Sequence, residues 1–523
     1  MLCQKLSIAA VWALSTASAD QFEYSPSVIL GAEVNTDNPN HGHDSSAILE
    51  SRQDNDLKVS IGTFLGDHRS QIAPVAVAAL NDGGAVVAGN GRFLFGRSPD
   101  VLVQGSNGTL VLIDKTSAVT ALARVGDRVD DVAVDAQTLV VVSGDFGVLV
   151  ADASQTSLST VWHDPIDKTG VHLAHATSKG GEVATQSHVA ISADGGTVAS
   201  AWSKEGHQTG CILSVHDGAG SLLGRVNKTG VICSDVAVDT DGATVFFSFY
   251  YVTHTGHEPI IMPAMHAYSR TLEPKWTDYD WDAHKLRPLD PKAVRCAGQV
   301  ADSRVLAISA KTKGSVLFCG HSDGGDSMFI CQPNDLNKSA PFGTVLPPPW
   351  SEPYDISAQS VSYLATMDAA TGDVVNSTFN LARLSSGRGN TIESEGITSD
   401  AAGFIYVVQT STCCIENRHN ATMTINGVPV ANYGGSDLTL LIIEPDWSSH
   451  RSWTAFAHGP NSSATAVGVS SSPGGDTVAV VATVQAGGLY TKQPIAGTAE
   501  PSDDRPGGYL AILPAVKPVP PLR

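Results

Sequence analysis

Apolar and polar positions alternate in one recurring pattern along most of the chain. A short apolar strand is followed by a turn rich in Asp, Ser and Gly and then by a strongly apolar strand, as in 75–90 and 188–203. Alternation with a period of two predicts β-strands, and Gly, Asp and Asn supply the backbone conformations of a tight hairpin turn. Seven copies of this hairpin begin at Val75, Asp131, His188, Asp235, Val305, Glu395 and Ala466.

A second pair of strands follows each hairpin, for example at 108–126 and 438–457. The last copy, "GYLAILPAVK" from Gly508, stops after one strand, and "LKVSIGTFLGD" from Leu57 can supply the missing one. Seven four-stranded units closed by an N-terminal strand predict an all-β fold, a seven-bladed β-propeller, in which ring closure protects the strand edges. A pair of β-sandwiches or an array of small β domains is the alternative that the irregular unit lengths allow.

The expected domain order follows from these repeats. A signal peptide at 1–19 and an N-terminal extension at 20–56 precede the propeller at 57–515, and a Pro-rich tail occupies 516–523. The fifth unit is lengthened at about 319–360, which predicts an insertion in that blade, with an eighth blade as the alternative.

The N-terminus has the pattern of a secretory signal. Lys5 precedes an apolar run from Leu6 to Leu14, and small residues precede Asp20. This run is too short to span a membrane, and no later run approaches the required length, so we expect a secreted protein of the extracellular space or cell surface. Six Asn-x-Ser/Thr sequons favour a eukaryotic glycoprotein over a bacterial exported protein: Asn107, Asn227, Asn337, Asn376, Asn420 and Asn461.

Composition narrows the class of partner. The net charge is −20, the acidic residues are dispersed, and charged residues make up only 16% of the chain. Phosphate binding needs a basic stripe, so nucleic acid is disfavoured as a partner. Abundant Gly, with 50 residues, fits an extracellular β protein with many turns. We expect a soluble monomer.

Residues 433–483 carry a Gly-Gly-x-Asp lead-in, a strand, an Asp-containing turn, a Trp-containing strand and an Asp-x-x-Gly-like hairpin, and 57–90 carries the second part of the same unit. This arrangement resembles the SBBP-type β-propeller repeat. The middle copies lack the Gly-Gly-x-Asp lead-in. The resemblance implies the fold and an extracellular or surface location, and because that family has no fixed active site, it transfers no catalytic residue.

Export also makes disulfides the expected state of the cysteines. Cys211 and Cys233 bracket neighbouring strands, and Cys319 and Cys331 bracket one hairpin, so both pairings fit the pattern. Cys413 and Cys414 can form a vicinal disulfide, or one of them can pair with Cys296; a thiolate metal site is disfavoured because no second Cys pair stands at zinc spacing.

The adjacent cysteines fall in the loop between the second and third strands of the sixth unit. A vicinal disulfide is rigid and flat, so it can form the floor of a ligand site. Trp350 and Tyr354 in the preceding insertion are candidate aromatic anchors for a partner, although packing of that loop on its own blade explains them equally well.

Histidine pairs are the candidate metal ligands. His172 and His175 form one pair, and His254 and His257 form another. Imidazoles bind Zn²⁺ or Cu²⁺ when the fold brings a third ligand, but solvated loop histidines are the simpler interpretation. Asp-rich turns such as that at Asp239 can bind Ca²⁺, although Asp also occurs in turns for its own backbone hydrogen bonds.

Motifs of known enzymes are scarce. We find neither a G-x-S-x-G elbow nor an H-E-x-x-H pair, so no cofactor is certain and whether the chain is an enzyme stays open. Residues 364–375 resemble one strand repeat of the pyrroloquinoline quinone dehydrogenases, but the motif occurs once and Asn376 replaces its Trp. The favoured function is a binding scaffold that engages a protein, glycan or matrix partner through its loops. A metal-dependent hydrolase or lyase is the alternative, and a quinoprotein-like oxidoreductase a minor one.

Overall fold

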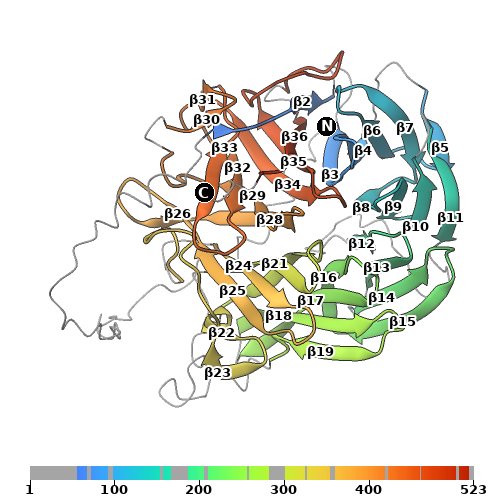
Figure 1. The fold of residues 1–523 in the computed structure, drawn as a ribbon, viewed down its shortest axis with the longest axis horizontal. Helices are drawn as coiled ribbons and strands as arrows, with labels where there is room; N and C mark the ends of the chain where they lie inside the picture. Colours follow the sequence, from blue (N-terminus) through green and yellow to red (C-terminus); the bar gives the residue numbers. More distant parts are fainter. Residues whose placement is uncertain are drawn as a thin grey trace, which may run out of the picture. The chain divides into compact units, whose positions relative to one another are not determined.

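A computed structural model shows antiparallel sheets arranged around a common centre (Figure 1). All of the described residues belong to one structural unit. The residues that the structure describes are 56–66, 72–91, 98–153, 157–165, 186–204, 210–255, 258–281, 301–323, 327–353, 360–418, 422–459, 461–501 and 506–517.

Two sheets come first along the chain. The first contains, in spatial order, β3 (Ile72–Ala79), β4 (Ala85–Gly91), β6 (Gly108–Ile113), β7 (Val119–Val125) and β5 (Asp100–Val103). The second contains β8 (Val129–Val134), β9 (Leu139–Gly144), β10 (Gly147–Asp152) and β11 (Ser159–Pro165).

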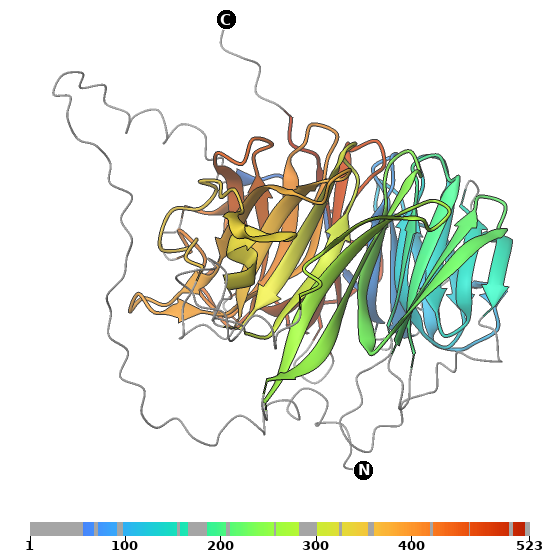
Figure 2. The ribbon, with the colours of Figure 1, turned by 90° about the horizontal axis from the view of Figure 1, so that it is seen from below.

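Three further sheets each follow the chain order outward from the centre. They contain β12 (Ser187–Ile191), β13 (Thr197–Lys204), β14 (Gly210–Asp217) and β15 (Leu222–Thr229); β16 (Val231–Val238), β17 (Thr244–Thr255), β18 (Glu258–Ser269) and β19 (Pro274–Asp278); and β20 (Ser303–Ser309), β21 (Ser315–Ser322), β24 (Val361–Asp368) and β25 (Val374–Asn380). The long hairpin of β17 and β18, lime green in Figure 2, extends beyond its neighbours.

Two more sheets complete the ring. One contains β28 (Ile392–Ser399), β29 (Ile405–Ser411), β32 (Asp437–Ile443) and β33 (His450–Ala455); the other contains β34 (Ser463–Ser471), β35 (Thr477–Ala486), β36 (Gly507–Pro514) and β2 (Ile61–Leu65). Strand β2 pairs antiparallel with β36, and Ile61 lies opposite Ile512. The N-terminal strand therefore completes the last sheet, as the sequence predicts.

The innermost strands of these sheets contact one another in a closed cycle. Along it, β3 contacts β8, β8 contacts β12, and the contacts continue through β16, β20 and β28 to β34, which returns to β3. Apolar side chains from facing sheets fill the space between them, such as Phe246 of β17 and Phe318 of β21, which belong to one core cluster. The β-propeller fold is confirmed, and an array of separate domains is excluded.

Three smaller sheets accompany the larger ones. They are β1 (Asp56–Leu57) with β30 (Thr424–Ile425) and β31 (Val428–Pro429); β22 (Cys331–Gln332) with β23 (Asp335–Ser339), preceded by the 3₁₀ turn η1 (Ser327–Ile330); and β26 (Ala382–Arg383) with β27 (Gly389–Asn390). Among the described residues, no helix is long and apolar enough to cross a membrane.

The number of sheets differs from the seven units that the repeats predict. Within the described residues, eight sheets have three or more strands: six have four strands, one has five, and β1, β30 and β31 form the eighth. The extra sheet arises because the strand expected from Leu57 onward is divided. Asp56–Leu57 pairs in parallel with β30, and only Ile61–Leu65 joins β36.

Candidate functional site

A β-bulge recurs at one level of the innermost strands. In the described strands β3, β8, β16, β20, β28 and β34, the register shifts by one residue near the strand's middle. The residues that follow the shift are Ala76, Asp131, Asp235, Ala307, Gly396 and Gly468. Bulges redirect side chains and are frequent beside functional sites.

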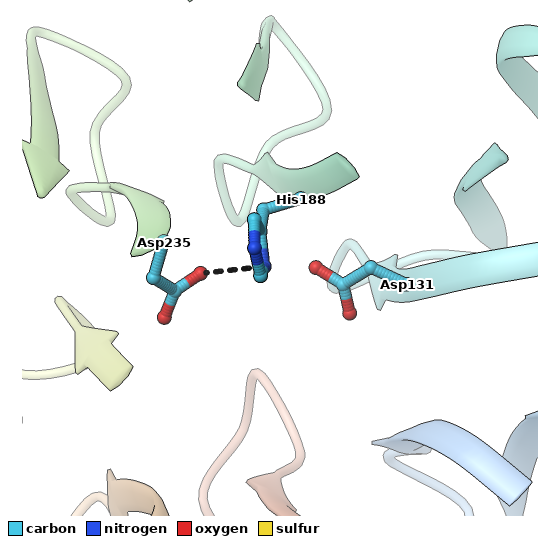
Figure 3. A group of neighbouring side chains, drawn as sticks. All are labelled: Asp131, His188 and Asp235. Carbon is cyan, nitrogen blue, oxygen red and sulfur yellow. Dashed lines mark ion pairs between the residues drawn. The ribbon is translucent and has the colours of Figure 1, made fainter. Parts of the chain in front are cut away.

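A cluster of three side chains lies at this level. His188, from β12, stands between Asp131 of β8 and Asp235 of β16, so that three neighbouring sheets each supply one group (Figure 3). One ligand atom from each residue lies within 4.8 Å of the others. The His188 Nδ1 atom is 3.7 Å from the Asp235 Oδ1 atom.

Backbone hydrogen bonds fix both carboxylates. Asp131 Oδ2 accepts the N–H of Val189 at 2.9 Å, and Asp235 Oδ2 accepts the N–H of Ile308 at 2.8 Å. The other oxygen of each accepts the N–H of the next residue in its own strand. Each carboxylate thus joins its own sheet to the following one. Because both of its oxygens accept backbone hydrogen bonds, the carboxylate has little freedom to rotate.

Burial works against charge in this cluster. Desolvation raises the pKa of Asp131 to about 7 and that of Asp235 well above its ordinary value, where the charge of Asp131 adds to the effect. Desolvation lowers the pKa of His188 to about 4. The side chains of His188 and Asp235 remain 19% and 16% exposed, so water or a small ion can reach them.

A cavity of about 150 Å³ begins at the two carboxylates. Its lining comes from the innermost strands and from Lys311, just after β20. Burial lowers the pKa of Lys311 to about 8. The space is polar at Asp131 and Asp235 and large enough for ordered water.

The structure brings together a different metal-ligand set from the one the sequence predicts. His172, His175 and His257 lie outside the described residues, as does the side chain of His254, so that prediction is untested. The sequence does contain a signal for the observed cluster: three successive copies of the repeat begin with Asp131, His188 and Asp235. In the Asp239 turn, the Asp241 carboxylate accepts the N–H of Ala243, as expected of a structural turn residue.

The two ends of the propeller's sheets carry different connections. In antiparallel sheets, the connections from first to second strand and from third to fourth lie at one end, and the remaining ones lie at the other. At the first end, the first-to-second connections are uniformly short: 80–84, 135–138, 192–196, 239–243, 310–314, 400–404 and 472–476. At the second end, long connections follow β11, β19, β21, β25, β29 and β35, and those after β11 and β19 lie mostly outside the described residues. We call the described residues 327–353, 381–391, 412–418, 422–436 and 487–501 the insertion surface.

Cys413 and Cys414 form a vicinal disulfide on the insertion surface. Cys414 is buried, and Cys413 is partly exposed. The N–H of Arg383 donates to the Cys414 carbonyl at 3.1 Å, and the Asn390 side chain donates to the Cys413 carbonyl at 2.8 Å. The β26–β27 hairpin therefore holds the disulfide in place.

Arg383 also connects this hairpin to the insertion before it. Its guanidinium donates to the Pro349 carbonyl at 2.9 Å and pairs with Glu352. Trp350, expected to be an exposed anchor, is half-buried against a core cluster, because its loop folds back on the sheet. Tyr354 lies outside the described residues.

Two exposed apolar side chains of the insertion surface were not identified from the sequence. Phe342 is 45% exposed and stacks on Phe379 with ring centroids 5.6 Å apart. Leu384, in the turn of the β26–β27 hairpin, is 39% exposed. No alternation of apolar and polar residues marks these two positions, because both stand in irregular loops, where the exposure of a side chain does not follow a regular period.

The cysteine pairings agree only in part with the predictions. Cys211 and Cys233 form a disulfide that joins β14 to β16. The predicted Cys319–Cys331 pair is wrong: Cys319 is a buried free thiol, and Cys331 is bonded elsewhere. Cys319 lies in the central strand β21, where its side chain faces the core rather than η1 and β22.

Most of the sequons in the described part of the chain have an exposed Asn side chain. Asn107, Asn227, Asn337 and Asn461 are exposed, whereas Asn376 in β25 is half-buried. Asn420 lies outside the described residues.

Comparison with known proteins establishes no family. No family model matches the chain, and no curated protein matches it. Among solved structures, it is similar to a chain of the "Mitotic Checkpoint Complex" at 12% identity, over 87% of this chain and 96% of that one, with a TM-score of 0.37. It is also similar to Sqt1 from Chaetomium thermophilum at 10% identity, over 88% of this chain and 100% of that one, with a TM-score of 0.37. The similarity to the RRP9 WD40 repeats is 9% identity, over 88% of this chain and 99% of that one, with a TM-score of 0.34.

These likenesses carry no functional argument, because the identities and TM-scores are low. The β-propeller is established by the chain's own sheets. The SBBP-type resemblance stays a prediction.

Proposed function

We propose that the protein is an extracellular binding scaffold whose insertion surface engages a partner protein. The observation that carries this proposal is the difference between the two ends of the sheets: one end has uniformly short first-to-second turns, whereas the other carries the long connections, and those of the insertion surface belong to three successive sheets. Binding residues are disproportionately found on loops positioned by a rigid scaffold.

Order within the insertion surface supports the same function. The vicinal disulfide, the β26–β27 hairpin and the Pro349–Glu352 segment are joined through Arg383. A preorganised surface loses less conformational entropy on binding than a mobile one. Phe342 and Leu384 supply exposed apolar contacts beside it. A glycan or matrix ligand is the alternative partner.

The test compares matched exposed leucines. We would screen the purified full chain against arrayed extracellular proteins and glycans, and measure the resulting complex by biolayer interferometry. Leu384→Asp and Phe342→Asp should each weaken binding about tenfold or more, since an anchor contributes more than about 1 kcal/mol. Leu222→Asp, at a leucine of β15 that is 47% exposed, should bind as the unmodified protein does.

Equal binding by Leu384→Asp, Phe342→Asp and Leu222→Asp would contradict the proposed surface. Replacing both Cys413 and Cys414 by Ser should leave the protein folded but weaken binding, because the disulfide shapes the loop. Selective binding to glycans, with no protein retained, would replace the protein partner by a glycan.

We also propose export and glycosylation. The pattern at 1–19 and the exposed sequon side chains at Asn107, Asn227, Asn337 and Asn461 support this. Expression in a eukaryotic secretory host, followed by mass spectrometry with and without glycosidase, should show a chain that begins at Asp20 and carries glycans. Retention inside the cell with an intact N-terminus would refute export.

A further inference from the structure

The cluster at the centre of the ring brings together three side chains of the types that bind metal ions. We propose that Asp131, His188 and Asp235 bind a divalent first-row transition-metal ion, of which Zn²⁺ and Mn²⁺ are the probes we choose. The inference is independent of the partner surface proposed above, because these residues stand on innermost strands rather than on the insertion surface.

The geometry supplies three converging ligands. One atom from each residue lies within 4.8 Å of the other two, and each residue comes from a different sheet (Figure 3). The Nε2 atom of His188 is buried and has no hydrogen-bond partner among the described residues. A buried imidazole nitrogen without a partner is costly unless a further group satisfies it.

The ligand types select the class of metal. Ca²⁺ and Mg²⁺ prefer oxygen ligands alone, whereas imidazole suits Zn²⁺ and neighbouring transition metals. The carboxylates are oriented by the backbone N–H groups of Val189 and Ile308, as ligating carboxylates commonly are. An ion at this place would therefore meet ligands whose directions are already fixed.

The remaining innermost strands carry small residues at the level of the cluster. The positions equivalent to Asp131 and Asp235 are occupied there by Ala76, Ala307, Gly396 and Gly468. A Cβ atom added at Gly468 would meet nothing within 4 Å, whereas one added at Gly396 would meet the backbone nitrogen of Val469 at 3.0 Å, so the free space lies beside Gly468. Together with the cavity at the carboxylates, this space lets water complete the coordination of the ion.

The competing interpretation is that the two carboxylates serve only to join neighbouring sheets. To separate the two, we would strip the purified full chain with a chelator, dialyse it, and titrate Zn²⁺ and Mn²⁺ by calorimetry. One ion per chain should bind. His188→Ala and Asp235→Asn should each weaken the affinity about 100-fold or more, since even outer partners of metal ligands commonly contribute 10- to 100-fold.

The matched control is His321→Ala. His321 is also paired with an aspartate, with Nε2 2.6 Å from Asp323 Oδ1, but belongs to no described group of three ligands. It should leave the affinity unchanged. His188→Gln provides a second variant of similar size if His188→Ala fails to fold, as judged by near-ultraviolet circular dichroism.

Two results would overturn the proposal. One is a folded, unmodified protein that binds neither ion at millimolar concentration. The other is binding by a folded His188 variant with unchanged affinity and stoichiometry, which would place the ion at other histidines. Binding of Co²⁺ with a visible absorption band that is lost in the His188 variants would support it.

Discussion

Asp278, at the end of β19, should make the protein less stable as the pH rises through neutrality. Its side chain is only 1% exposed, and neither carboxyl oxygen has a hydrogen-bond partner among the described residues. Burial and, to a lesser extent, the nearby charge of Asp373 raise the pKa of Asp278 from the ordinary value of 3.8 to about 8. The folded protein therefore holds the proton at a pH where the unfolded chain has released it.

The sign and size of the effect follow from proton linkage. Because the folded state binds more protons between pH 3.8 and about 8, the free energy of unfolding falls as the pH rises through this range. The slope is about 1.4 kcal/mol per pH unit, so Asp278 should remove about 2.7 kcal/mol between pH 5 and pH 7. Asp278→Asn has no proton to lose and should lack this contribution.

Urea denaturation at pH 5, 6 and 7, followed by Trp fluorescence, measures the difference. The difference in unfolding free energy between Asp278→Asn and the unmodified protein should grow with pH in favour of the variant. Asp82→Asn, at an exposed turn aspartate, controls for the loss of one negative charge and should follow the unmodified protein. A difference that stays constant over this range would refute the reasoning.

Three further perturbations have expected outcomes. Replacing Cys211 and Cys233 by Ser opens a link between residues 22 apart and should lower the unfolding free energy by about 3 kcal/mol in urea. Arg418→Met should cost about 3–5 kcal/mol, read as a lower thermal midpoint, because it leaves the buried Asp437 carboxylate unpaired; the Asp437→Leu double variant should recover much of the loss. Gly475→Val should lower the same midpoint, because φ is +73° and a Cβ there would meet a neighbouring backbone at 2.1 Å; an unchanged midpoint would contradict it.

The sequence predicts the repeating sheets well because each is a local pattern. Alternation and turn residues indicate hairpins such as β34–β35, and the incomplete last unit indicates the pairing of β2 with β36. The division at Asp56–Leu57 was not predictable, since it depends on β30, which lies far along the chain.

The cluster of Asp131, His188 and Asp235 was harder to predict from the sequence, for a physical reason. Asp131 and Asp235 stand where a turn-rich repeat has Asp in several places, and their convergence depends on the bulge and on ring closure. His188 belongs to the described inner strand that lacks this register shift, yet it lies at the same level. Only the packing of neighbouring sheets places the three groups together.

The pairing of β2 with β36 has a consequence for the order in which the protein folds. A chain emerging from the ribosome makes Ile61 long before Ile512, and until β36 is present, β2 has no partner in its sheet. Ring closure is therefore the final step of synthesis-coupled folding, and the ring of a nascent chain stays open until β36 has been made. A circular permutation with new ends in the 239–243 turn should keep the closed ring but move this late step to the hairpin of β16 and β17.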